Sequence, residues 1–490
     1  MAQQHICIIG GGIWWLSAAI YLARAWYSVE VLEKNDHLGG RASLLEADGF
    51  RRDMWPSWYL MPDLFEHVFA DRWEDIHQYL TLARLDPMYR IYYKDTPETI
   101  DIYQDISKNE DRYERVEPGS VAQLRRYVAR AKEQYDIAVR EFIPFNYDSI
   151  FDFFKPRLLF KAWRVPLFST ISSYVKQFFR TPFLQKIVQY PMVFLGTPPN
   201  KSPALYNIMS HVDFGLGVWY PQGGIYEIIK ALIAIGTKHG VQYTTHAEVM
   251  RINVEAGHAT GVTLTDGRQK KADYVVANAD MHRVETHLLS GSEQTYDEAY
   301  RASKTLAPSG FIVYLGIRGE MKSLRHHTLI FSQHREKNFE EIFDTYEFPE
   351  DPSLYICCPS KTDSSVAPVW HENMFILVPF PCRTDMSVED QNVYKDKMYT
   401  LIEQTIGETF RDRIVSEHLF TGKHFEERYH AYKGTALGLA HTLWQTALFR
   451  PNTYSKRVAW LYYVGGYTNP GIGMPMCLLS WKLVADRLVS

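Results

Sequence analysis

The sequence predicts an α/β fold in which a parallel-sheet domain is assembled from separate pieces of the chain. Three observations support this fold class: a strand-turn-helix-strand unit opens the chain, α/β patterning returns after Pro221, and a strand, a glycine-rich loop and a helix close it. At 490 residues the chain exceeds the ~100–200 residues of one compact domain, so two or three interleaved domains are expected.

The opening unit predicts a dinucleotide site. Strands are expected at residues 6–9 and 29–32, on either side of a helix at 16–24. Gly10 and Gly12 lie in the turn before the helix, where backbone amides and the helix dipole favour a pyrophosphate. Glu33 ends the second strand and is placed to accept hydrogen bonds from a ribose.

The middle and the end of the chain add further elements of the same kind. A helix is expected at 225–239, and residues 310–420 predict a larger sheet. The remaining expected elements are strands at 241–245, 249–253, 260–264, 272–278 and 461–464, a hairpin turn at Asp266-Gly267, a glycine-rich loop at 465–475 and a helix at 476–488.

Composition excludes some classes of protein. The 53 basic and 57 acidic residues give a net charge of −4 and no global nucleic-acid signal. No C-x-x-C motif occurs among the five cysteines, which are Cys7, Cys357, Cys358, Cys382 and Cys477. They are interpreted as reduced packing residues of a cytoplasmic protein, and a catalytic thiol or redox pair is the alternative. No metal site is predicted. The N-terminus lacks an export signal, and no segment reaches the ~18 apolar residues of a membrane span, so any membrane contact is expected to be peripheral.

Several motifs, in order along the chain, resemble those of the FAD-binding amine-oxidase-like superfamily, and most closely its bacterial phytoene desaturases. They are LEKNDHLGGRA at 32–42, WYPQGGIYEII at 219–229, HAEVMRI at 246–252, CPSKTDSSVAP at 358–368 and LYYVGGYTNPGIGMPMCLLSWKLVADRL at 461–488. The resemblance implies a three-layer (β-β-α), Rossmann-like FAD-binding domain at 1–85, 211–290 and 456–490. It also implies a discontinuous mixed-sheet substrate domain at 86–145 and 291–455, and a helical membrane-associating subdomain at 146–210.

The resemblance also implies which residues bind FAD and which chemistry follows. Cofactor contacts are expected from Gly10, Gly12, Glu33, Lys34, Gly40, Arg41, Val249, Gly466, Gly473 and Met474. The implied reaction is dehydrogenation of phytoene, or of a C30 analogue, by hydride transfer to the flavin and proton loss from the adjacent carbon. A carotenoid isomerase, ketolase or oxygenase on the same fold stays open. The candidate catalytic residues are Asn469, Tyr467, Asp363 and Arg428, and none of them is identified as the proton acceptor.

The polyene substrate implies partners as well. Residues 151–180 combine basic and aromatic side chains, which predicts a monotopic surface on the inner face of the cell membrane. A helical subdomain with snorkelling arginines is an equal alternative. A quinone or oxygen is expected to accept the electrons, and an oligomer is possible.

Tryptophan stands at several positions where glycine or another small residue is expected. Trp15 replaces the third glycine of the G-x-G-x-x-G fingerprint, where overpacking would cost ~1–3 kcal/mol. The other positions are Trp14, Trp26, Trp55, Trp460 and Trp481. Either these indoles block the flavin site, leaving an inactive scaffold, or the backbone has shifted and kept it.

Overall fold

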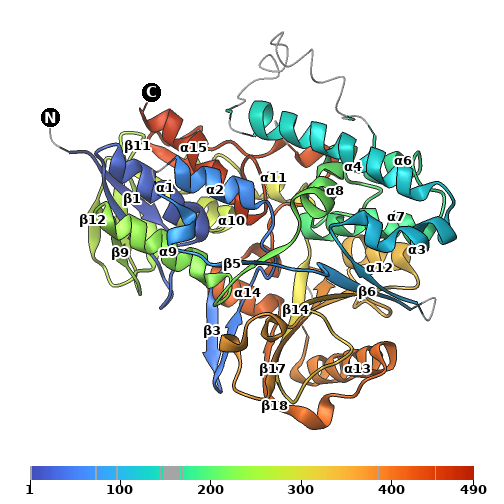
Figure 1. The fold of residues 1–490 in the computed structure, drawn as a ribbon. Helices are drawn as coiled ribbons and strands as arrows, with labels where there is room; N and C mark the ends of the chain where they lie inside the picture. The colour runs from blue at the N-terminus through green and yellow to red at the C-terminus, as the bar shows by residue number, and fades with distance from the viewer. Residues whose placement is uncertain are drawn as a thin grey trace.

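The computed structural model describes residues 3–71, 74–94, 98–143, 145–146, 166, 169–382, 386–446 and 449–489. Figure 1 shows two sheet-based regions with a group of helices beside them, and both ends of the chain lie on the same side.

The first region is a three-layer β-β-α domain. Five parallel strands run in the order β19-β13-β1-β2-β9. They are β1 (His5–Ile9), β2 (Ser28–Leu32), β9 (Gln242–Thr244), β13 (Tyr274–Ala277) and β19 (Leu461–Tyr463). The helices α1 (Ile13–Arg24), α9 (Tyr226–Lys238) and α15 (Met474–Val489) pack together over one face. An antiparallel sheet covers the other face: β10 (Val249–Glu255), β11 (His258–Leu264) and β12 (Gln269–Lys271).

Alternation along the strands explains this layering. In β1, Ile6 and Ile8 belong to the core shared with the helices, whereas Cys7 and Ile9 belong to the core shared with the antiparallel sheet. Both faces of a parallel strand are therefore buried, as its continuous apolar run predicts. The predicted α/β fold class is confirmed, and the strands of the parallel sheet lie in three separate parts of the chain, at residues 5–32, 242–277 and 461–463.

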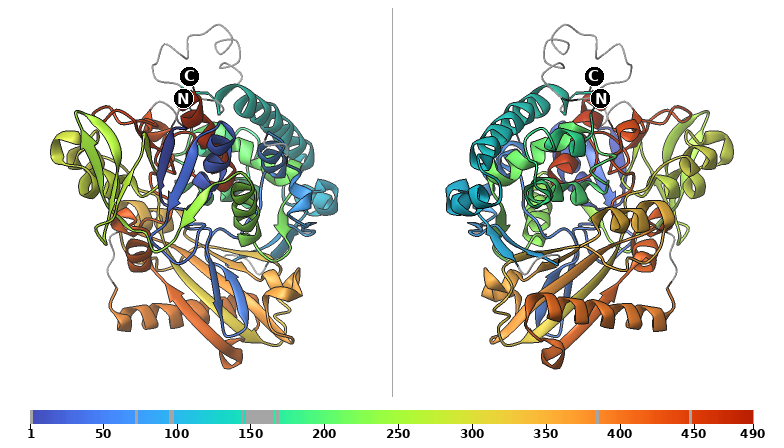
Figure 2. Two further views of the ribbon diagram at one scale, coloured as in Figure 1. Left: turned by 90° about the vertical axis from the view of Figure 1, so that its left-hand side faces the viewer. Right: turned by 90° about the vertical axis from the view of Figure 1, so that its right-hand side faces the viewer.

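The second region is a seven-stranded mixed sheet in the order β18-β14-β17-β16-β15-β6-β7, in which only the β15–β6 pair is parallel. Its strands are β6 (Tyr89–Tyr93), β7 (Thr99–Ile102), β14 (Ser309–Arg318), β15 (His327–Phe331), β16 (Leu354–Cys357), β17 (His371–Phe380) and β18 (Ile414–Phe420). α13 (Val388–Ile406) covers its outer face (Figures 1 and 2). The inner face turns its aromatic side chains toward the other region.

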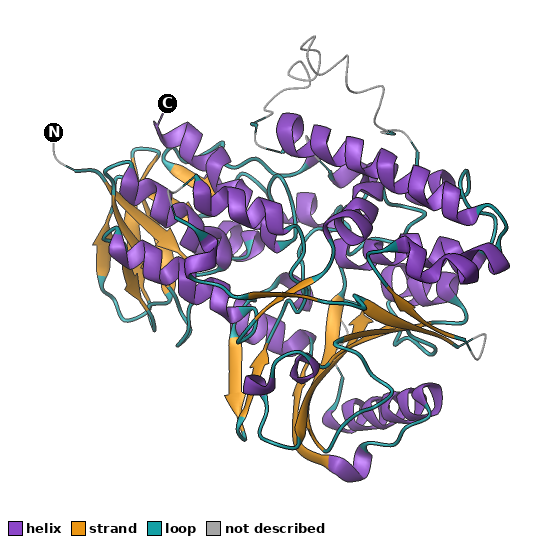
Figure 3. Cartoon of the chain, in the orientation of Figure 1, coloured by secondary structure: helices purple, strands orange, loops and turns teal. Residues whose placement is uncertain are grey.

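Helices and two short hairpin-like sheets complete the chain, as the colouring of Figure 3 shows. The helices are α2 (Pro62–Ala70), α3 (Glu110–Val116), α4 (Ser120–Ile137), α6 (Ile171–Val175), α7 (Pro182–Gln189), α8 (Ile208–His211), α10 (Met281–Arg283), α11 (Glu298–Ala302), α12 (Arg335–Glu340) and α14 (Gly422–Tyr429). The small sheets pair β3 (Leu44–Ala47) with β4 (Phe50–Asp53) and β5 (Leu82–Arg84) with β8 (Trp219–Pro221).

Much of the predicted basic and aromatic stretch at 151–180 lies outside the described residues, which include only residue 166 and residues 169–180 of it, with α6 at Ile171–Val175. Its role at a membrane therefore stays a prediction. Among the described helices, none is both long and apolar enough to cross a bilayer.

Candidate functional site

A cavity of about 1130 Å³ lies between the two sheet regions. It begins at the turn before α1 and reaches the inner face of the seven-stranded sheet. A typical ligand pocket measures ~300–1,000 Å³, so this one has room for more than one small molecule.

The turn before α1 is shaped for a ligand that approaches the backbone. Gly10 has φ +96°, and a Cβ on Gly40 would lie 3.0 Å from the Cα of Gly12. The amide of Gly39 donates to the carbonyl of Gly11 at 2.8 Å, which ties the second glycine turn to the first. No side chain caps α1 at Gly12, so the first amides of this helix are left for an anion.

Glu33 closes one end of this turn. Its side chain is buried, and its carboxylate accepts hydrogen bonds from the amide of Gly11 at 2.7 Å and from both nitrogens of Asn35 at 2.8 Å. Because a carboxylate offers about four acceptor positions, Glu33 keeps capacity for a ribose hydroxyl. Glu33 lines the cavity, and its contact with a ribose stays a prediction.

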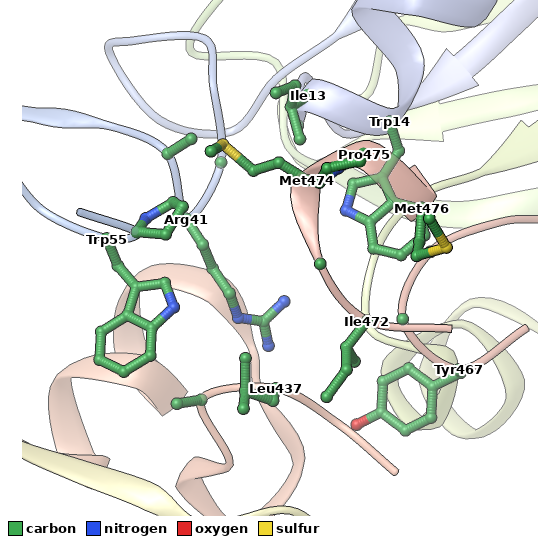
Figure 4. A pocket seen from close by; sticks show the side chains of 18 of the residues that line it. Ile13, Trp14, Arg41, Trp55, Leu437, Tyr467, Ile472, Met474, Pro475 and Met476 are labelled. Carbon is green, nitrogen blue, oxygen red and sulfur yellow. The ribbon is translucent and has the colours of Figure 1, made fainter. Parts of the chain in front are cut away.

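Three arginines line the same half of the cavity: Arg41, Arg283 and Arg428. The Nε atom of each is buried without a hydrogen-bond partner within the described structure. In Figure 4, Arg41 points into the cavity, and the hydrogen bond from its Nη2 to the carbonyl of Thr435 is 3.4 Å long. Unpaired buried guanidinium nitrogens fit an anionic pyrophosphate, so the residues present match the phosphate part of FAD.

The two adjacent tryptophans at the start of α1 point in different directions. Trp14 lines the cavity, and its indole lies between Gly12 and Gly466, 3.9 and 3.8 Å from the positions where their Cβ atoms would be (Figure 4). Trp15 is fully buried in the core that α1 shares with α9 and α15. Trp15 therefore does not enter the cavity, and the cavity lining includes Gly10 and Gly40 as well as Tyr467 and Asn469 together with Trp14.

Lys34 and Val249 lie at the outer end of the nucleotide half. Lys34 Nζ donates to the carbonyl of Glu427 at 2.7 Å and contacts His430 Nε2 at 3.3 Å. His430 in turn contacts Glu248 Oε1 at 2.9 Å. Burial lowers the pKa values of Lys34 and His430. The sequence motif around Val249 thus meets the motif around Glu33 at one end of the cavity.

The C-terminal loop forms the opposite wall. Gly466, Gly473 and Met474 line the cavity, and α15 begins at Met474 with its N-terminus toward it (Figure 4). The buried Arg450 donates to the carbonyl of Gly466 at 2.7 Å, which fixes the loop. A helix N-terminus here would stabilise negative charge on a reduced flavin ring.

The four candidate catalytic residues do not come together. Tyr467 and Asn469 line the cavity beside the C-terminal loop, and the Tyr467 hydroxyl donates to Asp280 Oδ2 at 2.6 Å. Arg428 lies at the nucleotide half, 3.5 Å from Asp36. Asp363 lies outside the cavity and accepts hydrogen bonds from the amide of Gly223 and from Ser365.

The inner face of the seven-stranded sheet supplies the other half of the cavity. It is apolar and aromatic: Leu329, Tyr355, Phe375 and Leu377 line the cavity, and Trp58, from the segment between β4 and α2, packs against Tyr355. Sequence reasoning did not single out these residues, because their shared position depends on pairing between distant strands. The continuous apolar run from Met374 to Phe380 in β17 was the available signal.

A buried His-His-Cys group lies behind this wall and was also missed. Trp58 stacks on His327 at 3.9 Å. The possible ligand atoms of His326, His327 and Cys357 lie within 4.8 Å of one another. The adjacent histidines of the sequence were the available signal. The described cysteines Cys7, Cys357, Cys358 and Cys382 are buried and form no disulfide.

Comparison with known proteins agrees with this geometry. The family model for flavin containing amine oxidoreductases matches residues 16–489. A carotenoid 3,4-desaturase of Haloarcula japonica is 44% identical over all of this chain and 99% of its own length. A zeta-carotene-forming phytoene desaturase of Myxococcus xanthus is 32% identical over 99% of this chain and 94% of its own. A solved redesigned putrescine oxidase, 12% identical, has the same fold with a TM-score of 0.63 over 99% of this chain and 98% of that one. The chain therefore belongs to the family of flavin-containing amine oxidoreductases and is an FAD-dependent oxidoreductase.

Proposed function

We propose that this protein is a carotenoid desaturase, which introduces a conjugated double bond into a long linear polyene. The observation that carries the proposal is the continuity of the cavity from the glycine turns and arginines to an apolar wall. The named desaturases among the relatives support the substrate class. A flavin-free scaffold is not supported, because the family match and the open cavity both favour a bound flavin.

FAD, when bound, supplies the hydride acceptor. Arg41, Arg283 and Arg428 would hold its phosphates, and Glu33 its ribose. The start of α15 would face the ring, and the indole of Trp14 would pack along the cofactor. The aromatic wall of Trp58, Tyr355 and Phe375 would orient the polyene and exclude water from the reacting carbons.

We propose further that the protein reaches its lipid-soluble substrate from the membrane surface, through the basic and aromatic residues 151–180, on the inner face of the membrane. A quinone or oxygen would reoxidise the flavin. Binding to vesicles with anionic lipids, measured by flotation, tests the membrane part independently of catalysis.

The purified protein, reconstituted with FAD, should bleach its flavin absorbance when phytoene, neurosporene or lycopene in lipid vesicles is added without oxygen. The product should have lost one pair of hydrogens, as measured by chromatography and mass spectrometry. Incorporation of labelled oxygen would instead assign an oxygenase, and an unchanged mass with altered geometry an isomerase. Absence of flavin bleaching with all three polyenes would contradict the proposal.

A further inference from the structure

A buried carboxyl lies behind the apolar half of the cavity. Asp213 is 3% exposed and lies in the turn Val212–Leu216, directly after α8. The Tyr89 hydroxyl donates to its Oδ2 at 2.6 Å, and the Tyr190 hydroxyl lies 3.0 and 3.1 Å from its two oxygens. Within the described part of the chain, no basic side chain forms an ion pair with this carboxyl.

Asp213 is the member of this cluster that changes charge near neutral pH. Burial raises the pKa of Asp213 to about 7, although the two hydroxyls act in the opposite direction. Burial raises the pKa values of Tyr89 and Tyr190 well above their usual range, and that of Tyr113, which faces Asp213 from α3, rises as well. Burial lowers the pKa of His211 on α8. The tyrosines and the histidine are therefore neutral where Asp213 titrates.

Tyr190 connects this carboxyl with the cavity. Tyr190 lines the cavity, whereas Asp213 lies behind it. The ring centroids of Tyr190 and Trp58 are 6.3 Å apart. Trp58 and the nearby Trp55 both line the cavity, and Figure 4 shows Trp55 together with Arg41. Tyr190 and Trp58 line the same cavity, so a polyene bound against Trp58 would lie beside the Tyr190 side chain, whose hydroxyl contacts Asp213.

Two other polar groups near the cavity are poor proton acceptors. His441 lines the cavity, but its Nε2 accepts a hydrogen bond from the amide of Ile472 at 3.2 Å. His327 is fully buried, with Nδ1 2.7 Å from the Tyr355 hydroxyl. Burial lowers the pKa of both histidines well below the usual range, so neither takes up a proton near neutral pH.

We propose that Tyr190 is the catalytic proton acceptor of the dehydrogenation and that Asp213 positions it and holds the transferred proton. The proposal rests on the desaturase function proposed above. A proton leaves the carbon next to the one that gives its hydride to the oxidised flavin, and it goes to Tyr190 Oη. The Tyr190 hydroxyl proton moves at the same time to a carboxylate oxygen of Asp213. The electron pair of the broken C–H bond becomes the new double bond, and Asp213 ends as a neutral acid.

The test uses the full-length, FAD-loaded protein with phytoene, neurosporene and lycopene in lipid vesicles. Anaerobic flavin reduction is followed in single turnovers from about pH 5.5 to 9. In the wild type the rate should fall as the pH drops below about 7, because protonated Asp213 cannot accept a proton. Asp213→Asn and Tyr190→Phe should each slow the reaction about 100-fold or more, and Asp213→Asn should remove the acid limb.

Two tyrosine variants separate chemistry from packing. Tyr89→Phe removes one donor to the carboxylate, so the acid limb should move to higher pH. Tyr113→Phe removes a hydroxyl that accepts a hydrogen bond from Asn109, and the acid limb should stay at the wild-type pH. FAD content and melting temperature are measured for each variant to show that it is folded and loaded. If Asp213→Asn does not fold, the proposal is tested with Tyr190→Phe.

A wild-type rate with the wild-type acid limb in Tyr190→Phe, or in a folded Asp213→Asn, would overturn the proton-accepting pair. A wild type that converts none of the three polyenes would instead defeat the desaturase proposal itself.

Discussion

The two halves of the cavity recognise their ligands by different means. The nucleotide half uses backbone: glycine turns, uncapped amides of α1 and the start of α15, with three arginines around them. The substrate half uses side chains: aromatic and aliphatic groups on one face of the mostly antiparallel seven-stranded sheet. The difference follows from architecture, because helix N-termini and strand ends meet at the edge of a parallel sheet, whereas the face of an antiparallel sheet presents every second side chain.

The nucleotide half depends on backbone contacts, and this explains why tryptophans can stand at nearby positions where glycine is expected. Adjacent helical residues point about 100° apart, so Trp14 enters the cavity while Trp15 enters the core. The backbone contacts that define the nucleotide half are formed by Gly10, Gly12 and Gly40, which remain glycines.

The largest expected effect is on folding of the nucleotide half. Trp15→Ala should lower the free energy of unfolding by about 3–5 kcal/mol, because a fully buried indole leaves a cavity between α1, α9 and α15. Urea denaturation at fixed FAD concentration measures it, since bound cofactor adds stability. A gain in stability would instead mean that the fingerprint position is overpacked, as the sequence suggested.

The next effect is on cofactor binding alone. Arg41→Ala should weaken FAD binding by about 10–100-fold, because a charge-assisted contact to the phosphates is lost. Fluorescence titration of the apoprotein measures it, with Arg268→Ala in the distant hairpin turn as the matched control. Equal FAD affinity in the Arg41 and Arg268 variants would show that the phosphates lie elsewhere.

The reciprocal change is in the substrate half. Leu377→Ser places a hydroxyl on the apolar wall and should raise the polyene concentration for half-maximal rate about 10-fold. FAD affinity should stay unchanged, because Leu377 belongs to the seven-stranded sheet. A parallel loss of FAD affinity would break the proposed separation of the two halves.

The smallest effect lies outside both halves. Trp26 is 85% exposed and has φ +69°, a left-handed conformation that suits glycine. Trp26→Gly should therefore raise the free energy of unfolding by about 1 kcal/mol. Val369→Gly is the control, since Val369 is also exposed, lies outside the cavity lining and has no positive φ. Destabilisation by Trp26→Gly would show that its indole makes stabilising contacts.

Much of the nucleotide half could be predicted from sequence. The order of strands, glycine turns and acidic strand end predicts the parallel sheet and places Gly10, Gly12, Glu33 and Arg41 near one another. Trp26 was identified as standing at a helix-ending glycine position, and its left-handed backbone agrees. Trp370, with φ +63°, was not identified, because the turn that contains it carries no comparable motif.

The sequence by itself determined the parallel sheet and the cofactor turns, because they depend on short-range patterns of strand, glycine and helix. The β-β-α layering was expected only from the family resemblance. Tertiary structure alone decided which side of α1 each adjacent tryptophan occupies. It also decided that Tyr89, Tyr190 and Asp213, which lie far apart in sequence, meet behind the apolar wall. Such clusters depend on how a strand, a turn and a helix end pack in space, and no local pattern encodes that packing.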